Sequence, residues 1–127
     1  MGTISRFEEI KAWQNARELT KKIYQLSALG EFSRDFGLRD QIRRAAVSIM
    51  SNIAEGFESQ TQSLFIKYLG IAKASAGEVR SQLYIASDLG YLSPEDLRNT
   101  INLTEKASRL IYGFIKYLQS QQNPKRI

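Results

Sequence analysis

Three polar residues stand at helical spacing in the stretch QIRRAAVSIMSNIAEG, which covers residues 41–56. Ser48, Asn52 and Glu55 are four and then three residues apart, so they share one stripe of a helix whose remaining positions are largely apolar. A hydroxyl, an amide and a carboxylate in one row can bind a polar ligand or a partner chain. They can equally bond to one another between packed helices, which is the commoner reason for partly buried polar residues.

A second group of residues is basic and comes from the two central helices of the chain. Its members are Arg39, Arg43, Arg44, Lys67 and Lys73. The chain has 18 Lys and Arg against 13 Asp and Glu, a net charge of +5, which favours a polyanionic partner. These side chains therefore predict a surface that binds RNA or DNA. Mixed charge on a solvated helix face is the alternative, because Asp40, Glu55 and Glu78 can neutralise much of it. The tyrosines are too scattered along the chain to predict a base-stacking platform.

The residue types that are missing lower the expectation of catalysis. The chain contains no cysteine and no histidine, which excludes thiolate chemistry, histidine bases and the usual transition-metal ligands. Glu55 and Glu58 could approach Glu8 or Glu9, but di-metal helical bundles pair their glutamates with histidine. We therefore expect a protein that is not an enzyme, with no metal and no cofactor.

No apolar run approaches the roughly 20 residues of a membrane-spanning helix, and residues 1–10 lack the apolar core of a secretory signal. We therefore expect a cytoplasmic protein with no membrane partner.

Four helical segments must position these side chains. Apolar residues recur at helical spacing over about 7–29, 34–57, 60–89 and 94–120, and no stretch alternates with the period of a strand. Gly30 and Gly90 follow the first and third segments, as C-terminal glycines do. Ser59 is expected to cap the third helix, whereas Ser93 followed by a proline marks the start of the fourth.

Short links between long helices force neighbours to run antiparallel, so residues 1–127 predict a single all-α domain, an up-down-up-down antiparallel four-helix bundle. Pairing about the turn at 58–60 sets Ile49 opposite Ala72. It also brings Glu78 level with residues 41–44. We therefore expect an ion pair from Glu78 to Arg43 or Arg44, and we add Glu78 to the polar structural or assembly network.

The third and fourth helices carry more apolar residues than one buried stripe requires. The additional ones are Leu69, Ile71, Tyr84, Ile85, Leu103, Tyr112 and Tyr117. A second buried face of this kind predicts a homo-oligomer.

The chain resembles the four-helix bundle proteins of the 23S rRNA-intervening-sequence family over nearly all of residues 7–118. The resemblance is carried by AWQNA at 12–16, RRAAVSI at 43–49, SNIAEG at 51–56 and LGYL at 89–92. Two positions depart from the family pattern: Met50 stands where proline is usual, and Gly77 stands where a larger residue is common.

The resemblance implies a small bacterial protein that assembles into homopentamers. Genes of this family were first noticed inside intervening sequences of large-subunit rRNA genes, which suggested RNA binding. A related group, the accessory variability proteins of diversity-generating retroelements, forms basic pentamers that bind nucleic acid and a reverse transcriptase. The family brings no catalytic residues to carry over. The leading hypothesis is thus a nucleic-acid-binding oligomer, and the alternative is a protein-assembly adaptor with no nucleic-acid role.

Overall fold

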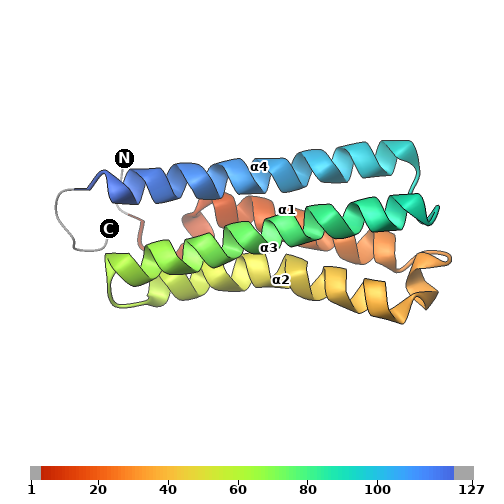
Figure 1. Ribbon diagram of the computed structural model, residues 1–127. Coiled ribbons are helices and arrows are strands. Elements are labelled where there is room, and N and C mark those ends of the chain that lie inside the picture. Colours follow the sequence, from red (N-terminus) through yellow and green to blue (C-terminus); the bar gives the residue numbers. More distant parts are fainter. Residues whose placement is uncertain (1–3, 122–127) are drawn as a thin grey trace.

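The computed structural model describes residues 4–121, which form a bundle of four long helices (Figure 1). The helices are α1 (Lys11–Ser27), α2 (Phe36–Glu58), α3 (Gln62–Asp88) and α4 (Pro94–Gln119). Short 3-10 turns precede α1 at Phe7–Glu9 and α2 at Phe32–Arg34. The described residues contain no strand, which confirms the all-α fold expected from the sequence.

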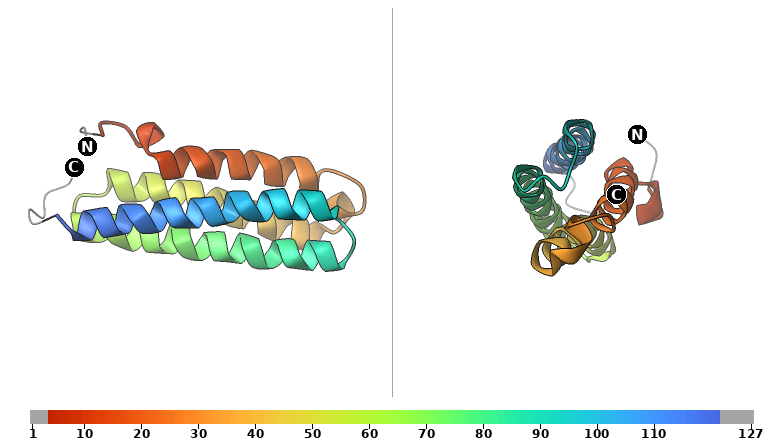
Figure 2. Two further views of the ribbon diagram at one scale, coloured as in Figure 1. Left: turned by 90° about the horizontal axis from the view of Figure 1, so that it is seen from above. Right: turned by 90° about the vertical axis from the view of Figure 1, so that its right-hand side faces the viewer.

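The four helices occupy the corners of the bundle in chain order (Figure 2). Each helix runs antiparallel to the one before it, and α1 meets α4 across the remaining side. Packing is most extensive between α2 and α3 and least extensive between α1 and α4. The seam between the first and last helices is therefore the least extensively packed of the four, in part because α1 is the shortest helix.

Local backbone geometry shortens the first helix relative to the predicted range 7–29. Ile10 is extended, with φ −74° and ψ 123°, so the chain makes a 3-10 turn and a bend before α1 begins at Lys11. Gly30 has a φ of +53°, which is the left-handed conformation expected of a residue just beyond a helix.

The cap of the third helix differs from the predicted one. Thr61 is extended and its side chain accepts a hydrogen bond of 3.1 Å from the backbone N–H of Leu64. Ser59 instead donates its hydroxyl to the carbonyl of Gly56, 2.6 Å away, at the end of α2. The prediction for α4 is confirmed, because Ser93 accepts from the N–H of Asp96 at 3.0 Å.

Aromatic rings fill one end of the core. Phe65 is fully buried, and its ring centroid lies 6.1 Å from that of Phe57 and 5.3 Å from that of Phe114, both in edge-to-face contact. Gly56 lies against the same ring, and a Cβ added there would stand 2.8 Å from Phe65 Cδ1 and 3.0 Å from Tyr68 Cβ. The close approach of α2 and α3 at this end thus depends on glycine.

At the other end of the bundle, Tyr91 of the α3–α4 loop contacts the segment that links α1 to α2. Its ring stacks on Phe32 at 5.4 Å, and its hydroxyl donates to Asp35 Oδ2 at 3.0 Å. This hydrogen bond raises the pKa of Tyr91 above its ordinary value. Within residues 4–121 no helix is both long enough and apolar enough to cross a bilayer.

Candidate nucleic-acid interface

The polar stripe on α2 is a bridge between two helices. Ser48 Oγ lies 3.0 Å from Ser75 Oγ of α3, and Asn52 donates through Nδ2 to the carbonyl and the hydroxyl of Ser48 at 2.8 and 3.0 Å. The sequence predicted Ser48 and Asn52 for a network of this kind but missed Ser75. Glu55 lies exposed outside the network, and residues 4–121 contain no cluster of three carboxylates that could hold a metal ion.

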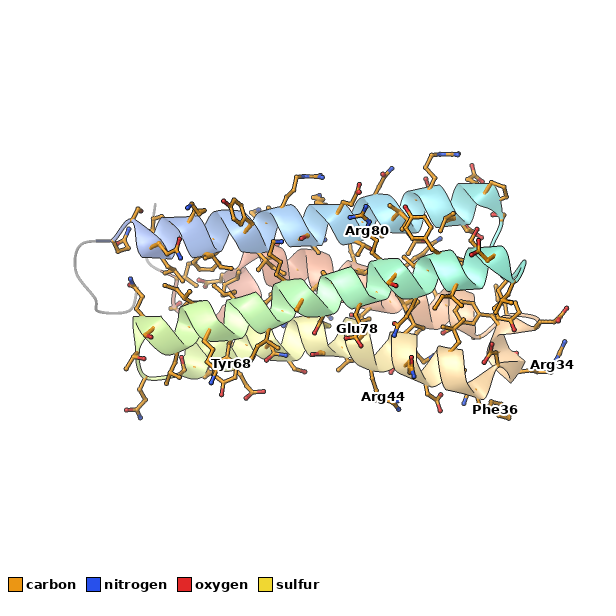
Figure 3. All side chains as sticks on the ribbon, in the orientation of Figure 1. Arg34, Phe36, Arg44, Tyr68, Glu78 and Arg80 are labelled. Carbon is orange, nitrogen blue, oxygen red and sulfur yellow. The ribbon has the colours of Figure 1, made fainter. Side chains whose placement is uncertain are left out.

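The expected ion pair of Glu78 is not formed. The side-chain amide of Gln82 donates to Gln41 Oε1 at 3.4 Å, so Gln82 stands level with Gln41 and Glu78 lies one helical turn away. Glu78 is exposed, and none of the four ion pairs among the described residues includes it. Arg44 points outward from α2 (Figure 3).

Arg43 faces the opposite way from Glu78. Its Nε donates to the buried Ser27 Oγ at 2.8 Å, and its guanidinium lies 4.5 Å from the centroid of the Tyr24 ring on α1. Arg39 is also engaged, because Nε lies 2.9 Å from Asp40 Oδ1 and the guanidinium covers the Phe36 ring at 4.8 Å. Arg43 therefore joins α2 to α1, whereas Arg39 makes its contacts near the start of α2.

The remaining predicted basic residues lie elsewhere. Arg44 and Lys67 are exposed, on α2 and α3, and no described side chain forms a hydrogen bond or ion pair with them. Lys73 lies at the far side of α3, against α4, with Nζ 6.0 Å from the centroid of the Tyr112 ring. The five residues predicted to form one basic surface are thus divided between two sides of the bundle, and their role in binding stays a prediction.

A shallow groove of about 740 Å³ runs along the outer face of α2. Its lining residues are Tyr24, Asp40, Arg43, Arg44, Val47, Ser48, Ser51, Asn52 and Glu55. Two arginines are matched there by two carboxylates, so the groove itself has no excess positive charge.

The excess positive charge lies on the other pair of helices. α1 and α4 together carry eight basic and four acidic side chains, whereas α2 and α3 carry six and five. The acids of α4 are Glu95, Asp96 and Glu105, and none follows them: from Lys106 to its end the helix carries three cations and no carboxylate. The sequence indicated the second and third helices as the basic surface, whereas the excess positive charge of the described helices lies on α1 and α4.

Four residues beside α4 form what we call the Tyr112 cluster: Lys73, Arg109, Tyr112 and Lys116. Arg109 and Tyr112 line a groove of about 340 Å³ with Lys73 and Ser108. The Nζ of Lys116 lies 5.8 Å from the Tyr112 ring centroid, close to the distance of Lys73. None of the three cations forms an ion pair within residues 4–121. An exposed aromatic ring is thus surrounded by unpaired positive charge.

A second basic groove lies on the other side of α4, at its seam with α1. It measures about 480 Å³, and Lys11, Arg17 and Lys106 supply three cations against the single carboxylate of Glu18. Asn15 lies beneath it, where Nδ2 donates to the carbonyl of Leu103 at 3.1 Å and ties the two helices together. Positive charge therefore flanks α4 on both sides.

Apolar side chains remain exposed on α3. Leu64, Ile71 and Ile85 are 39, 40 and 46% exposed. They lie seven and then fourteen residues apart on one stripe, and the exposed Glu78 occupies the position between Ile71 and Ile85. Among the other residues predicted to form a second apolar face, Tyr84 and Tyr112 are exposed, whereas Leu69 is fully buried in the core of the bundle. The prediction for Leu69 is therefore wrong, because this residue serves the core of its own chain.

The chain is similar to one protein family in sequence and to a solved structure in fold. The family model described as 23S rRNA-intervening sequence protein matches residues 8–113. The fold is similar to the crystal structure of a protein of unknown function from the S23 ribosomal protein family of Bacteroides thetaiotaomicron. The TM-score is 0.77 at 25% sequence identity, over 83% of this chain and 95% of that one. Among functionally curated proteins, none matches the chain.

Proposed function

Because the chain belongs to the 23S rRNA-intervening sequence protein family, we propose that it is a non-enzymatic, homo-oligomeric bundle that binds nucleic acid, either RNA or DNA. The observation that carries this proposal is the charge distribution around α4. Its C-terminal half and the adjoining edges of α1 and α3 present cations that form no ion pair with the part of the chain that the structure describes, and few carboxylates lie among them. Lysine and arginine side chains of this kind neutralise phosphates and supply most sequence-independent affinity for nucleic acid.

The family name and the ribosomal family of the structural neighbour support an RNA-related role. The resemblance to this family and to the accessory variability proteins also leads us to propose that the chain assembles into a homopentamer. Its protein partner would be a reverse transcriptase or another protein. We place the function in the cytoplasm of a bacterium, with no membrane partner. Exposed Arg44 and Lys67 add positive charge on the far side of the bundle, whereas Arg39 and Arg43 act mainly in packing.

The test is fluorescence anisotropy of labelled structured RNA and of duplex DNA, titrated with purified protein across a series of salt concentrations. We expect log affinity to fall linearly with log salt, with a slope of roughly −0.7 to −0.9 for each phosphate contacted. Weak binding that is independent of salt would contradict the proposal, because released counterions are the signature of phosphate contacts.

The alternative function, a protein-assembly adaptor, is favoured by one observation, the exposed apolar stripe on α3. Apolar residues at multiples of seven on a helix suit packing against a second helix, which would also have to accommodate the Glu78 carboxylate of this stripe. Self-association through this stripe is compatible with nucleic-acid binding on α4, because the stripe and the Tyr112 cluster use different side chains.

Ile71→Asp combined with Ile85→Asp is expected to reduce the native mass to that of a single chain, since buried charge without a partner is strongly unfavourable at an interface. Size-exclusion chromatography with light scattering measures the mass. Val47→Asp is the control, because Val47 is equally exposed, at 39%, but lies on α2. An unchanged mass in the double variant, with helicity retained, would exclude the α3 stripe as the interface.

A further inference from the structure

We propose that Tyr112 is a stacking platform for an unpaired nucleobase, so that the surface around α4 prefers single-stranded nucleic acid over duplex. This inference rests on the proposed nucleic-acid-binding function and adds the form of the ligand. It is carried by the Tyr112 cluster, in which an aromatic ring stands exposed among three cations.

The Tyr112 ring lies at the surface of α4. Tyr112 is 52% exposed. Phe65, Phe114 and Tyr117 form ring-to-ring contacts nearby, but among the described residues no such contact includes Tyr112. The ammonium groups of Lys73 and Lys116 lie over this ring, so a planar ligand that stacks on it displaces two flexible side chains rather than core residues. Bases stack on such rings with little dependence on sequence, because every base has a π face.

The three cations are arranged around the Tyr112 ring. Arg109, Tyr112 and Lys116 are spaced by three and four residues and so share one side of α4, while Lys73 reaches the ring from α3. Both ammonium groups stand about 6 Å from the ring centroid on flexible stems, and no carboxylate of residues 4–121 forms an ion pair with them. They can therefore turn to the phosphates on either side of a base that occupies the ring.

An exposed ring among cations favours single-stranded over double-stranded nucleic acid. In a duplex the bases are stacked on one another and paired, so a surface ring beside a helix reaches phosphate and sugar but no base face. In a single strand each base can leave its neighbours and lie on an aromatic side chain. A surface with cations alone would bind both forms, whereas a surface with cations around an open ring gains affinity for the single strand.

The experiment compares two labelled strands of about 12 nucleotides, within the usual site size for single-strand binding: oligodeoxythymidylate and the same backbone with abasic residues. With the wild-type chain, we expect the thymine strand to bind more tightly than the abasic strand. Tyr112→Ala should lower the affinity for the thymine strand by roughly 5- to 150-fold, because one stacked base is lost. The affinity for the abasic strand should not change. A duplex should also be unaffected by this substitution.

Two control variants separate stacking from other effects. Tyr112→Phe keeps the ring and should bind both strands as the wild type does. Tyr84→Ala removes a tyrosine that is 46% exposed on α3, and it should change neither affinity. Circular dichroism before and after heating checks that each variant folds, which we expect because Tyr112 lies at the surface.

The outcomes distinguish this inference from the function it rests on. Tyr112→Ala could lower the affinity for the thymine, abasic and duplex ligands equally, or change none of these affinities while the wild type still binds with a steep salt dependence. Either result would overturn the stacking platform and leave the proposed nucleic-acid binding in place. Absence of salt-dependent binding to every ligand would overturn both. A selective loss for the thymine strand supports the platform.

Discussion

Gly56→Ala is expected to lower the free energy of unfolding by about 2–3 kcal/mol, although alanine is the better helix former. The added methyl would stand 2.8 Å from the ring of Phe65, 3.0 Å from Tyr68 Cβ and 3.3 Å from the Phe65 carbonyl oxygen. Phe65 is fully buried between other rings, and a carbonyl cannot turn aside, so α2 and α3 must separate. Chemical denaturation followed by circular dichroism measures the loss, which corresponds to a fall in Tm of roughly 10 °C.

The control is the same substitution at Gly77. This residue also lies inside a helix, but a Cβ added there would have no neighbour within 4 Å. Gly77→Ala should therefore stabilise the bundle by about 1 kcal/mol, through helix propensity alone. If both alanine variants shifted stability in the same direction, the contact of Gly56 with α3 would not be what makes glycine necessary there.

Lys73→Glu combined with Arg109→Glu is expected to have the largest effect on nucleic-acid affinity, a loss of about a hundredfold at low salt. The two residues line one groove from α3 and α4, and neither forms an ion pair among the described residues. Each lost phosphate contact should also reduce the slope of log affinity against log salt by about one. Anisotropy titrations with single-stranded RNA over a range of salt concentrations measure both quantities.

A matched pair of reversals lies on the other surface. Arg44→Glu combined with Lys67→Glu makes the same change in net charge at two exposed residues of α2 and α3. We expect this pair to weaken binding by a much smaller factor, through the overall field of the protein. Should it weaken binding more than the α4 pair, the nucleic acid would lie on the surface that the sequence pattern first indicated.

The helical parts of the fold were predictable because their signals are local. Ser93 before a proline, Gly30 after a periodic segment and the absence of alternation depend on neighbours in the chain, and the structure confirms them. The bend at Ile10 was missed because apolar spacing continues through it. Thr61 was missed as a cap because Ser59, two residues earlier, offered an equally good pattern.

The candidate site was harder to predict, because it depends on register and on which side of a helix a long side chain takes. Arg43 was expected to turn toward α3 and instead turned toward Ser27 of α1, since a buried hydroxyl and a tyrosine ring were available there. The Tyr112 cluster was missed because one of its cations comes from α3 and the others from α4. One sequence signal did exist: no acidic residue follows Glu105 within α4.

The uneven packing around the bundle has a consequence for how the chain folds. Three of the four helix pairs join segments that follow each other in sequence, and the most extensive pair, α2 with α3, is a simple hairpin. Only the seam between α1 and α4 requires a long loop to close, which costs conformational entropy. This seam also has the fewest contacts to offset that cost. We expect the central hairpin to form early and this seam to close last, so the basic groove at the seam is completed only in the final step of folding.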